Sequence, residues 1–215
     1  MRRFFPSLLA ALVVCLCFGS PAAAQSGSNK FKIGEHYSTL AAPAMLTEPD
    51  DGRIEVVAFF WYGCGSCFVV DDTITKWAAK LPKDVRFVRR PMIGNPSLDL
   101  HGQIFFALRQ LGLDHKADMV VFDLFQNQRR PVRSVADLGE VAKALKISEA
   151  DFKAAFDSKE VKAEMANLEK LMKAYDIPGV PSMVINGKYH FDIGTTNGVD
   201  GMLELSDILI KSERR

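Results

Sequence analysis

The sequence contains few cysteines, with four among its 215 residues. Disulfide-dense scaffolds are usually much smaller chains that need several cross-links for stability. Four cysteines in a chain of this length therefore exclude that class of protein. Cys15 and Cys17 lie in the N-terminal hydrophobic segment, so the folded part of the chain keeps only Cys64 and Cys67. A chain of this length can bury its own core, so the remaining pair calls for a role other than stabilising the fold.

The sequence also has little excess charge of either sign. It carries 27 Lys and Arg residues against 26 Asp and Glu residues, a formal net charge of +1. Losing Arg2 and Arg3 with a signal peptide leaves 25 against 26, a net charge of −1. This balance does not favour nucleic acid or an anionic membrane surface as a partner. No internal repeat or low-complexity linker is present, and a hydrophobic content of 48% is typical of a globular domain.

Residues 1–24 have the features of a secretory signal peptide. Arg2 and Arg3 precede an apolar run that is too short to span a bilayer comfortably, and the small residues Ala22–Ala24 follow it. A membrane anchor or a lipidated terminus is the alternative. The short run disfavours the anchor, and Val14 before Cys15 is a poor match for the small residue of a lipoprotein site. We therefore expect cleavage after Ala24, export of the protein, and a mature chain of residues 25–215 that forms a single domain.

The segment Arg53–Trp61 is a nearly continuous run of β-branched and aromatic residues, which is typical of a strand buried on both faces of its sheet. Beyond Gly63, apolar residues recur at helical spacing as far as Leu81. Asp84–Arg90 then reads as another short strand. These elements predict a right-handed β-α-β unit with parallel strands, in which both cysteines lie where a central strand turns into a helix.

A long helical segment follows over about residues 98–175. The chain returns to strand in Ser182–Phe191, where Asn186-Gly187 between two β-rich arms is a strong hairpin signal. A last amphipathic helix is predicted over residues 201–212. The sequence therefore predicts one α/β domain with a helical insertion between the β-α-β unit and the C-terminal hairpin and helix.

The spacing of Cys64 and Cys67 can be compared with metal and haem sites. A structural zinc site needs about four protein ligands and a catalytic one about three, whereas this motif supplies two. The other candidate ligands are far apart in the sequence: His36, His101, His115 and His190. Covalent haem attachment needs a histidine after the second cysteine, where this chain has Phe68. We expect neither a metal nor a cofactor.

A structural disulfide is also disfavoured, because a loop closed by four residues removes little entropy from the unfolded chain. Thiol–disulfide exchange needs a nucleophile at a helix N-terminus, where unpaired amides and the helix dipole favour the thiolate. It also needs a second sulfur about one turn along. The predicted turn places Cys64 at the helix start and Cys67 one turn further, so the motif favours redox chemistry.

Two segments resemble a known family: VVAFFWYGCGSCFVVDDTITKW at residues 56–77 and YDIPGVPSMVINGKYHFDIG at residues 175–194. They look like parts of the DsbA family of periplasmic thiol:disulfide interchange proteins, which are thioredoxin-fold proteins with a helical insertion. The resemblance runs from about Phe31 to Ile210. Its specific parts are the aromatic strand into Cys-x-x-Cys, the long helical interval, and Gly-Val-Pro before the hairpin.

The resemblance implies a role for each site residue. Cys64 would be the exposed nucleophile and Cys67 the buried partner, and together they would form the redox-active disulfide. Pro181 would be a cis proline that faces the active site. Val180 before it would present its backbone to an extended substrate segment, much as an added strand pairs with a sheet edge.

The resemblance also implies an activity and its partners. We expect a monomeric periplasmic oxidase that introduces disulfides into exported proteins with reduced cysteines and is reoxidised by a quinone-linked membrane protein. The rival enzyme activity is disulfide reduction or isomerisation. A third alternative is a peptide-binding, chaperone-like module that uses the groove near Pro181 without turnover.

This sequence departs from the family pattern at three positions. Gly65 and Ser66 replace the usual Pro-His between the cysteines, and Ala58 replaces a buried acidic residue. Because Ser66 supplies a neutral hydroxyl where histidine supplies a cation, we expect a less depressed Cys64 pKa and a less oxidising disulfide. With alanine at position 58, we expect no buried carboxyl group near Cys67. Asp71 matches an acidic position of the family and is equally compatible with a solvated helix charge.

Overall fold

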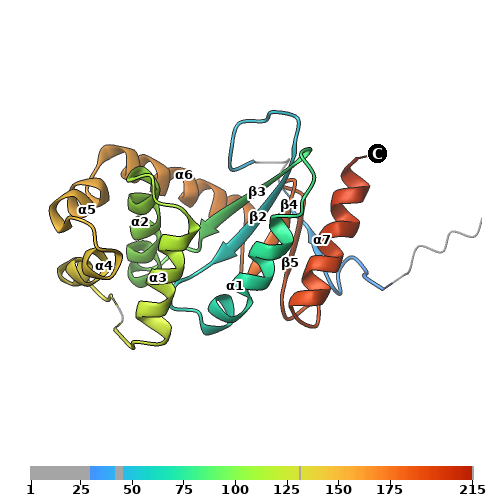
Figure 1. Ribbon diagram of the computed structural model, residues 1–215. Coiled ribbons are helices and arrows are strands. Elements are labelled where there is room, and N and C mark those ends of the chain that lie inside the picture. Colours follow the sequence, from blue (N-terminus) through green and yellow to red (C-terminus); the bar gives the residue numbers. More distant parts are fainter. Residues whose placement is uncertain (1–29, 42–45, 131, 215) are drawn as a thin grey trace, which may run out of the picture.

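The computed structural model describes residues 30–41, 46–130 and 132–214. The predicted signal peptide, residues 1–24, lies outside this part of the chain. The described residues form a five-stranded sheet of order β1-β5-β4-β2-β3, with helices around it (Figure 1). No helix among them is both long enough and apolar enough to cross a membrane.

The predicted β-α-β unit is present, with bounds close to those expected. β2 spans Ile54–Phe60, α1 spans Gly65–Ala78, and β3 spans Val85–Pro91. β3 pairs with β2 in parallel, and every residue of β2 is buried. This burial on both faces explains the unbroken run of apolar residues in the central strand.

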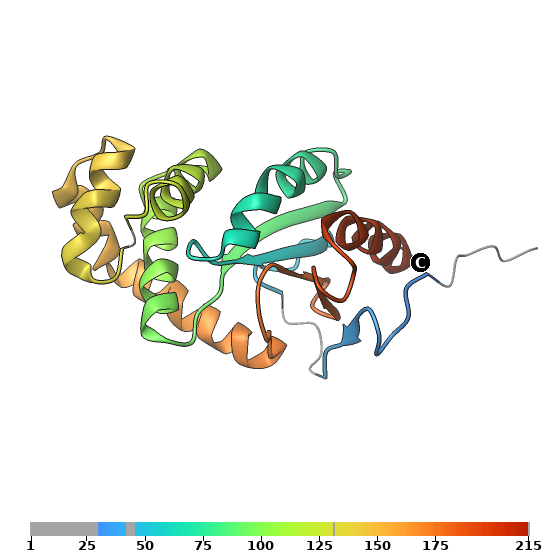
Figure 2. The same ribbon diagram turned by 90° about the horizontal axis from the view of Figure 1, so that it is seen from below.

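The two faces of the sheet are covered by different helices. α1 and α7 (Val199–Glu213) lie on one face, where Val56 and Ala58 of β2 join their core (Figure 2). Val57 and Phe59 point to the opposite face, which α6 covers. The alternation follows from the two-residue period of a strand.

The helical insertion consists of the helices between β3 and β4. Its α-helices are α2 (Pro96–Gln110), α3 (His115–Gln126), α4 (Leu138–Leu145), α5 (Glu149–Phe156) and α6 (Lys159–Tyr175), with a short 3-10 turn, η1 (Val135–Asp137), before α4. Side chains of Asn95, Asp114, Ser148 and Ser158 cap α2, α3, α5 and α6. Each cap satisfies backbone N–H groups that the first helical turn leaves unpaired.

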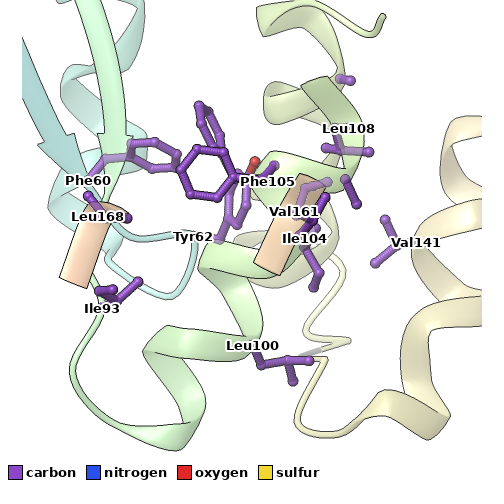
Figure 3. Close-up of a cluster of buried hydrophobic side chains, with 14 of the residues drawn as sticks. Phe60, Tyr62, Ile93, Leu100, Ile104, Phe105, Leu108, Val141, Val161 and Leu168 are labelled. Atoms are coloured by element: carbon purple, nitrogen blue, oxygen red, sulfur yellow. The ribbon is translucent and has the colours of Figure 1, made fainter. Parts of the chain in front are cut away.

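The helical insertion packs against the end of β2 through one continuous apolar core (Figure 3). Phe60 at the end of β2 contacts Phe105 of α2 and Phe122 of α3, with ring centroids 5.5 and 5.7 Å apart. The strand that leads into the cysteines is therefore held by aromatic side chains of the insertion.

The predicted hairpin is formed by β4 (Ser182–Ile185) and β5 (Tyr189–Asp192). Asn186 and Gly187 have φ angles of 51° and 62°, as the two central positions of a type I′ turn require. β5 also pairs with β1 (Ser38–Thr39), a two-residue strand that the sequence pattern did not predict because it is too short to show a period.

Candidate active site

Cys64 is the N-cap residue of α1. Its backbone is extended, and its Sγ accepts a hydrogen bond from the backbone N–H of Cys67 at 3.2 Å. The Oγ of Ser66 lies 3.2 Å from the same sulfur. The sulfur thus takes the place that a serine or aspartate oxygen has in an ordinary helix cap, where backbone N–H groups and the helix dipole stabilise negative charge.

These contacts lower the pKa of Cys64 to about 6. The hydrogen bond from the Cys67 side chain has the largest effect, burial opposes it, and the Ser66 hydroxyl and the backbone N–H groups of both residues add to the lowering. The direction agrees with the prediction for a thiol at a helix start. At neutral pH the Cys64 thiol is therefore mostly thiolate, the form that attacks disulfides.

Cys67 lies one turn further along α1 and is 3% exposed, and both cysteines are free thiols. Its hydrogen bond to Cys64 and its burial raise the pKa of Cys67 far above the usual thiol range, and the negative charge of Asp71 raises it further. The two sulfurs therefore differ sharply: one is half-buried and ionised, and the other is buried and protonated.

The loop before β4 approaches Cys64 from the other side of the site. The Val180–Pro181 peptide bond is cis, as the resemblance implied. The carbonyl oxygen of Val180 lies 3.6 Å from the Sγ of Cys64. The structure thus brings Cys64, Cys67, Val180 and Pro181 together from two segments that are more than a hundred residues apart in the chain.

The turn between β2 and α1 is held by the helical insertion. Tyr62 is fully buried, donates a 2.6 Å hydrogen bond to Asp118, and accepts one at its carbonyl oxygen from Gln126. The indole of Trp61 lies over Gly63, where a Cβ atom would come within 2.3 Å of the ring. Only glycine fits at this position without displacing the indole.

Of the two alternatives for Asp71, the solvated helix charge is wrong, because the side chain is 3% exposed. It pairs with Arg89 of β3, and its Oδ2 lies 2.7 Å from Nε2 of His115 of α3. Burial raises the pKa of Asp71, but the hydrogen bond from His115 and the charge of Arg89 outweigh it and the net pKa is lowered. Asp71 is therefore an ionised carboxylate inside the protein, stabilised by the charge of Arg89 and the hydrogen bond with His115.

The expectation that no buried carboxyl group lies near Cys67 is also wrong, because Asp71 is close enough to raise the pKa of that thiol. Ala58 is buried in the core below α1, as its place in a central strand predicts. Sequence reasoning missed His115 and Asp118 as neighbours of the site. No local spacing signals them, since they reach the site from α3, far from α1 in the chain.

Among the described residues, no group of three or more His, Cys, Asp and Glu side chains is arranged to hold a metal ion. His101, one of the four candidate ligands, is instead buried with its Nε2 3.1 Å from the carbonyl oxygen of Val132 and its ring stacked on Trp61.

Known proteins are similar to this chain in both sequence and fold. A model of the DSBA-like thioredoxin domain matches residues 92–209. The thiol:disulfide interchange protein DsbA of Pseudomonas syringae pv. tomato is 38% identical over 206 residues, which cover 95% of this chain and 94% of the relative. The corresponding protein of Azotobacter vinelandii is 35% identical and is aligned over 100% of this chain and 99% of its own length.

Among solved structures, the crystal structure of Pseudomonas aeruginosa DsbA has a TM-score of 0.82 and 35% sequence identity, covering 87% of this chain and 96% of that one. This neighbour confirms the predicted fold class, an α/β thioredoxin-like fold with a helical insertion. The chain therefore belongs to the DsbA family and is a thiol:disulfide oxidoreductase.

Proposed function

We propose that the chain introduces disulfides into exported proteins by exchange through Cys64 and Cys67, with Cys64 as the nucleophile. The observation that carries this proposal is the asymmetry of the two sulfurs. The Sγ of Cys64 caps α1 and has a pKa of about 6, whereas Cys67 is buried with a raised pKa. A low-pKa sulfur at a helix start is both an accessible electrophile in the disulfide and a good leaving group in a mixed disulfide.

The proposed cycle starts from the Cys64–Cys67 disulfide. A substrate thiolate attacks the Sγ of Cys64, a bond forms between these two sulfurs, and the electron pair of the broken disulfide goes to Cys67. A second substrate thiolate then attacks the substrate sulfur of the mixed disulfide. Cys64 leaves as a thiolate, so the substrate is oxidised by two electrons and the enzyme is reduced by two.

We assign substrate binding to Val180 and Pro181. The carbonyl oxygen of Val180 lies 3.6 Å from the Sγ of Cys64, so a segment that pairs with this backbone would bring its own cysteine close to the reactive sulfur. Pairing through main-chain hydrogen bonds recognises an extended segment and is tolerant of its side chains. This mode suits an enzyme that must act on many unfolded exported proteins.

The cellular setting belongs to the same proposal. Residues 1–24 would direct export and be removed, and residues 25–215 would act as a single monomeric domain in the periplasm. Electrons taken from substrates would leave through a quinone-linked membrane protein that reoxidises the cysteine pair. No metal or organic cofactor is needed for this cycle, because the two sulfurs carry the electrons.

The opposite direction of electron flow is the second candidate. Gly65 and Ser66 favour it, because a neutral residue between the cysteines stabilises the thiolate of Cys64 less than a cation does. A pair that is held reduced by a membrane donor would then reduce or isomerise disulfides.

Two measurements test the proposal. Rapid thiol alkylation in intact cells should find Cys64 and Cys67 mostly as a disulfide, whereas a mostly dithiol pair would support the reductase or isomerase. The purified oxidised protein should oxidise a reduced two-cysteine peptide, and Cys64→Ser should abolish this activity. A wild-type protein that shows no such turnover, with peptide binding unchanged by Cys64→Ser, would instead support the peptide-binding module.

A further inference from the structure

The proposed cycle requires a proton at a buried position. When Cys67 leaves the disulfide it becomes a thiolate, although its burial and the negative charge of Asp71 raise its pKa. A buried thiolate of this kind is a strong base, so its release is slow unless a proton reaches it. Position 58 of β2, where the family usually has an acid, holds Ala58 and supplies none.

Asp71 is a buried carboxylate on the same helix as Cys67. It lies one helical turn beyond Cys67, and both side chains are on the buried face of α1. Its negative charge raises the pKa of Cys67. At neutral pH, however, Asp71 has no proton of its own to give, because its pKa is lowered below the usual carboxyl range.

His115 is the titratable group that can transfer a proton to Asp71. Its Nε2 lies 2.7 Å from Oδ2 of Asp71, and its Nδ1 lies 3.4 Å from Oδ2 of Asp118. An imidazolium donates from both nitrogens, so this position between two carboxylates fits the protonated ring. Burial opposes protonation, but the hydrogen bonds to Asp118 and Asp71 outweigh it and the net pKa of His115 is raised.

His115 also has access to water. Its side chain is 27% exposed, and it lines an open cleft of about 1180 Å³ between β3, α1 and α2. Cys67, in contrast, is sealed from solvent. The charged and polar groups that face the imidazole come from each element packed around it: Asp71 and Thr75 of α1, Arg89 of β3, Arg109 of α2, and Asp118 of α3.

We propose that His115, acting through Asp71, is a positioning residue that supplies the proton taken up by Cys67 when the Cys64–Cys67 disulfide opens. This inference rests on the proposed exchange through those two cysteines. The imidazolium gives its Nε2 proton to Asp71 as that carboxyl group protonates the Cys67 thiolate. The sum is one proton moved from His115 to Cys67, and the neutral imidazole takes a replacement from water in the cleft.

The test is a single-turnover measurement between pH 5.5 and 9. The oxidised protein and its His115→Gln variant are mixed with a one-cysteine peptide, and the rate of opening of the Cys64–Cys67 disulfide is measured. Glutamine keeps a hydrogen-bond donor toward Asp71 but cannot titrate. The ratio of wild-type to variant rates removes the ionisation of the peptide itself, which is common to both proteins.

We expect the wild type to be about tenfold faster at low pH, less than the 10²-fold or more that a directly positioned acid contributes. The ratio should fall to about one as pH rises through the pKa of His115. The matched control is His36→Gln. The Nδ1 of His36 accepts a hydrogen bond from the backbone N–H of Lys32 in the N-terminal segment. The ratio of wild-type to His36→Gln rates should stay near one at every pH.

A ratio for His115→Gln that does not change with pH would overturn the inference and leave His115 a purely structural link between α1 and α3. If His115→Gln does not fold, His115→Ala is measured with and without added imidazole, which the open cleft admits. Acceleration by imidazole that follows its protonated fraction supports the relay, and no acceleration overturns it. Exchange that survives Cys64→Ser would instead contradict the proposed function, so the two failures are distinguishable.

Discussion

The backbone N–H of Cys67 donates a hydrogen bond to the Sγ of Cys64 at 3.2 Å. The reactive sulfur is therefore itself the cap of α1, and the helix that buries Cys67 is the helix that stabilises the Cys64 thiolate. Reactivity and local folding are coupled at this position. Changes at the first turn of α1 should alter the pKa of Cys64 and the redox potential together.

Ser66 provides the most direct test of this coupling. Its Oγ lies 3.2 Å from the Cys64 sulfur and contributes to the lowered pKa. Removing a hydrogen bond to a charged group costs about 1.5 kcal/mol, so Ser66→Ala should raise the pKa of Cys64 by about one unit. Ser66→His should lower it and make the disulfide more oxidising. Thiolate absorbance against pH measures the pKa of Cys64, and equilibration with glutathione measures the redox potential. If neither substitution changed the pKa of Cys64, residue 66 would not determine that pKa.

The pKa of Cys64 also predicts how the stability of the reduced protein depends on pH. The folded pKa of about 6 lies below the usual thiol value of about 8.5, so the stabilisation is fully present above the higher value and lost as pH falls through the lower one. The difference in unfolding free energy between the reduced and oxidised proteins should therefore grow in favour of the reduced form from pH 6 to pH 8. Denaturant unfolding of both forms measures this difference, and a flat profile would contradict the lowered pKa.

Asp71 and Asp72 form a matched pair on α1. Asp71 is buried against Arg89, whereas Asp72 pairs with Lys76 on the surface, where both side chains are about 70% exposed. Asp71→Ala should cost about 3 kcal/mol or more, because it leaves a buried guanidinium unpaired. Asp72→Ala should cost less than about 1 kcal/mol. Equal losses in denaturant unfolding would mean that the buried pair makes no special contribution.

Gly63 should resist substitution because of the indole above it. A Cβ atom would lie 2.3 Å from Cζ2 of Trp61, and that ring is stacked on His101 and cannot move away freely. Gly63→Ala should therefore lower the unfolding free energy by about 1 to 3 kcal/mol, the usual cost of overpacking. Gly179→Ala is the control, since no atom lies within 4 Å of its added Cβ. If thermal unfolding showed the same small change for both variants, the indole would not restrict this position.

Much of the fold could be predicted because its signals are local. The apolar run of β2, the helical spacing after Gly63 and the Asn186-Gly187 turn each reflect the backbone geometry of the element itself. The position of Cys64 at a helix start followed from the same local pattern. Pro181 was placed at the site by resemblance, because no local signal distinguishes it from the other prolines of the chain.

The polar side chains around His115 could not be predicted to meet, because they come from four elements. They are Asp71 of α1, Arg89 of β3, Arg109 of α2 and Asp118 of α3. Whether Asp71 is solvated depends on Arg89 of β3 and His115 of α3, and its own helix carries no sign of either partner. The same holds for Tyr62 and Asp118, which meet only once the insertion folds back over the end of β2. Long-range pairing of this kind is specified by tertiary packing rather than by residue periodicity.

Trapping of the mixed disulfide tests most directly whether Cys64 is the sulfur that bonds to the substrate. Cys67→Ser is first converted with oxidised glutathione to a mixed disulfide between Cys64 and glutathione, and reduced substrate proteins are then added. A substrate thiolate should displace glutathione from Cys64, and the covalent complex should accumulate because position 67 no longer carries a thiol that could resolve it. Cys64→Ser treated in the same way should form no complexes, because its remaining Cys67 is buried and protonated. Complexes that instead formed with Cys64→Ser, linked through Cys67, would contradict the account.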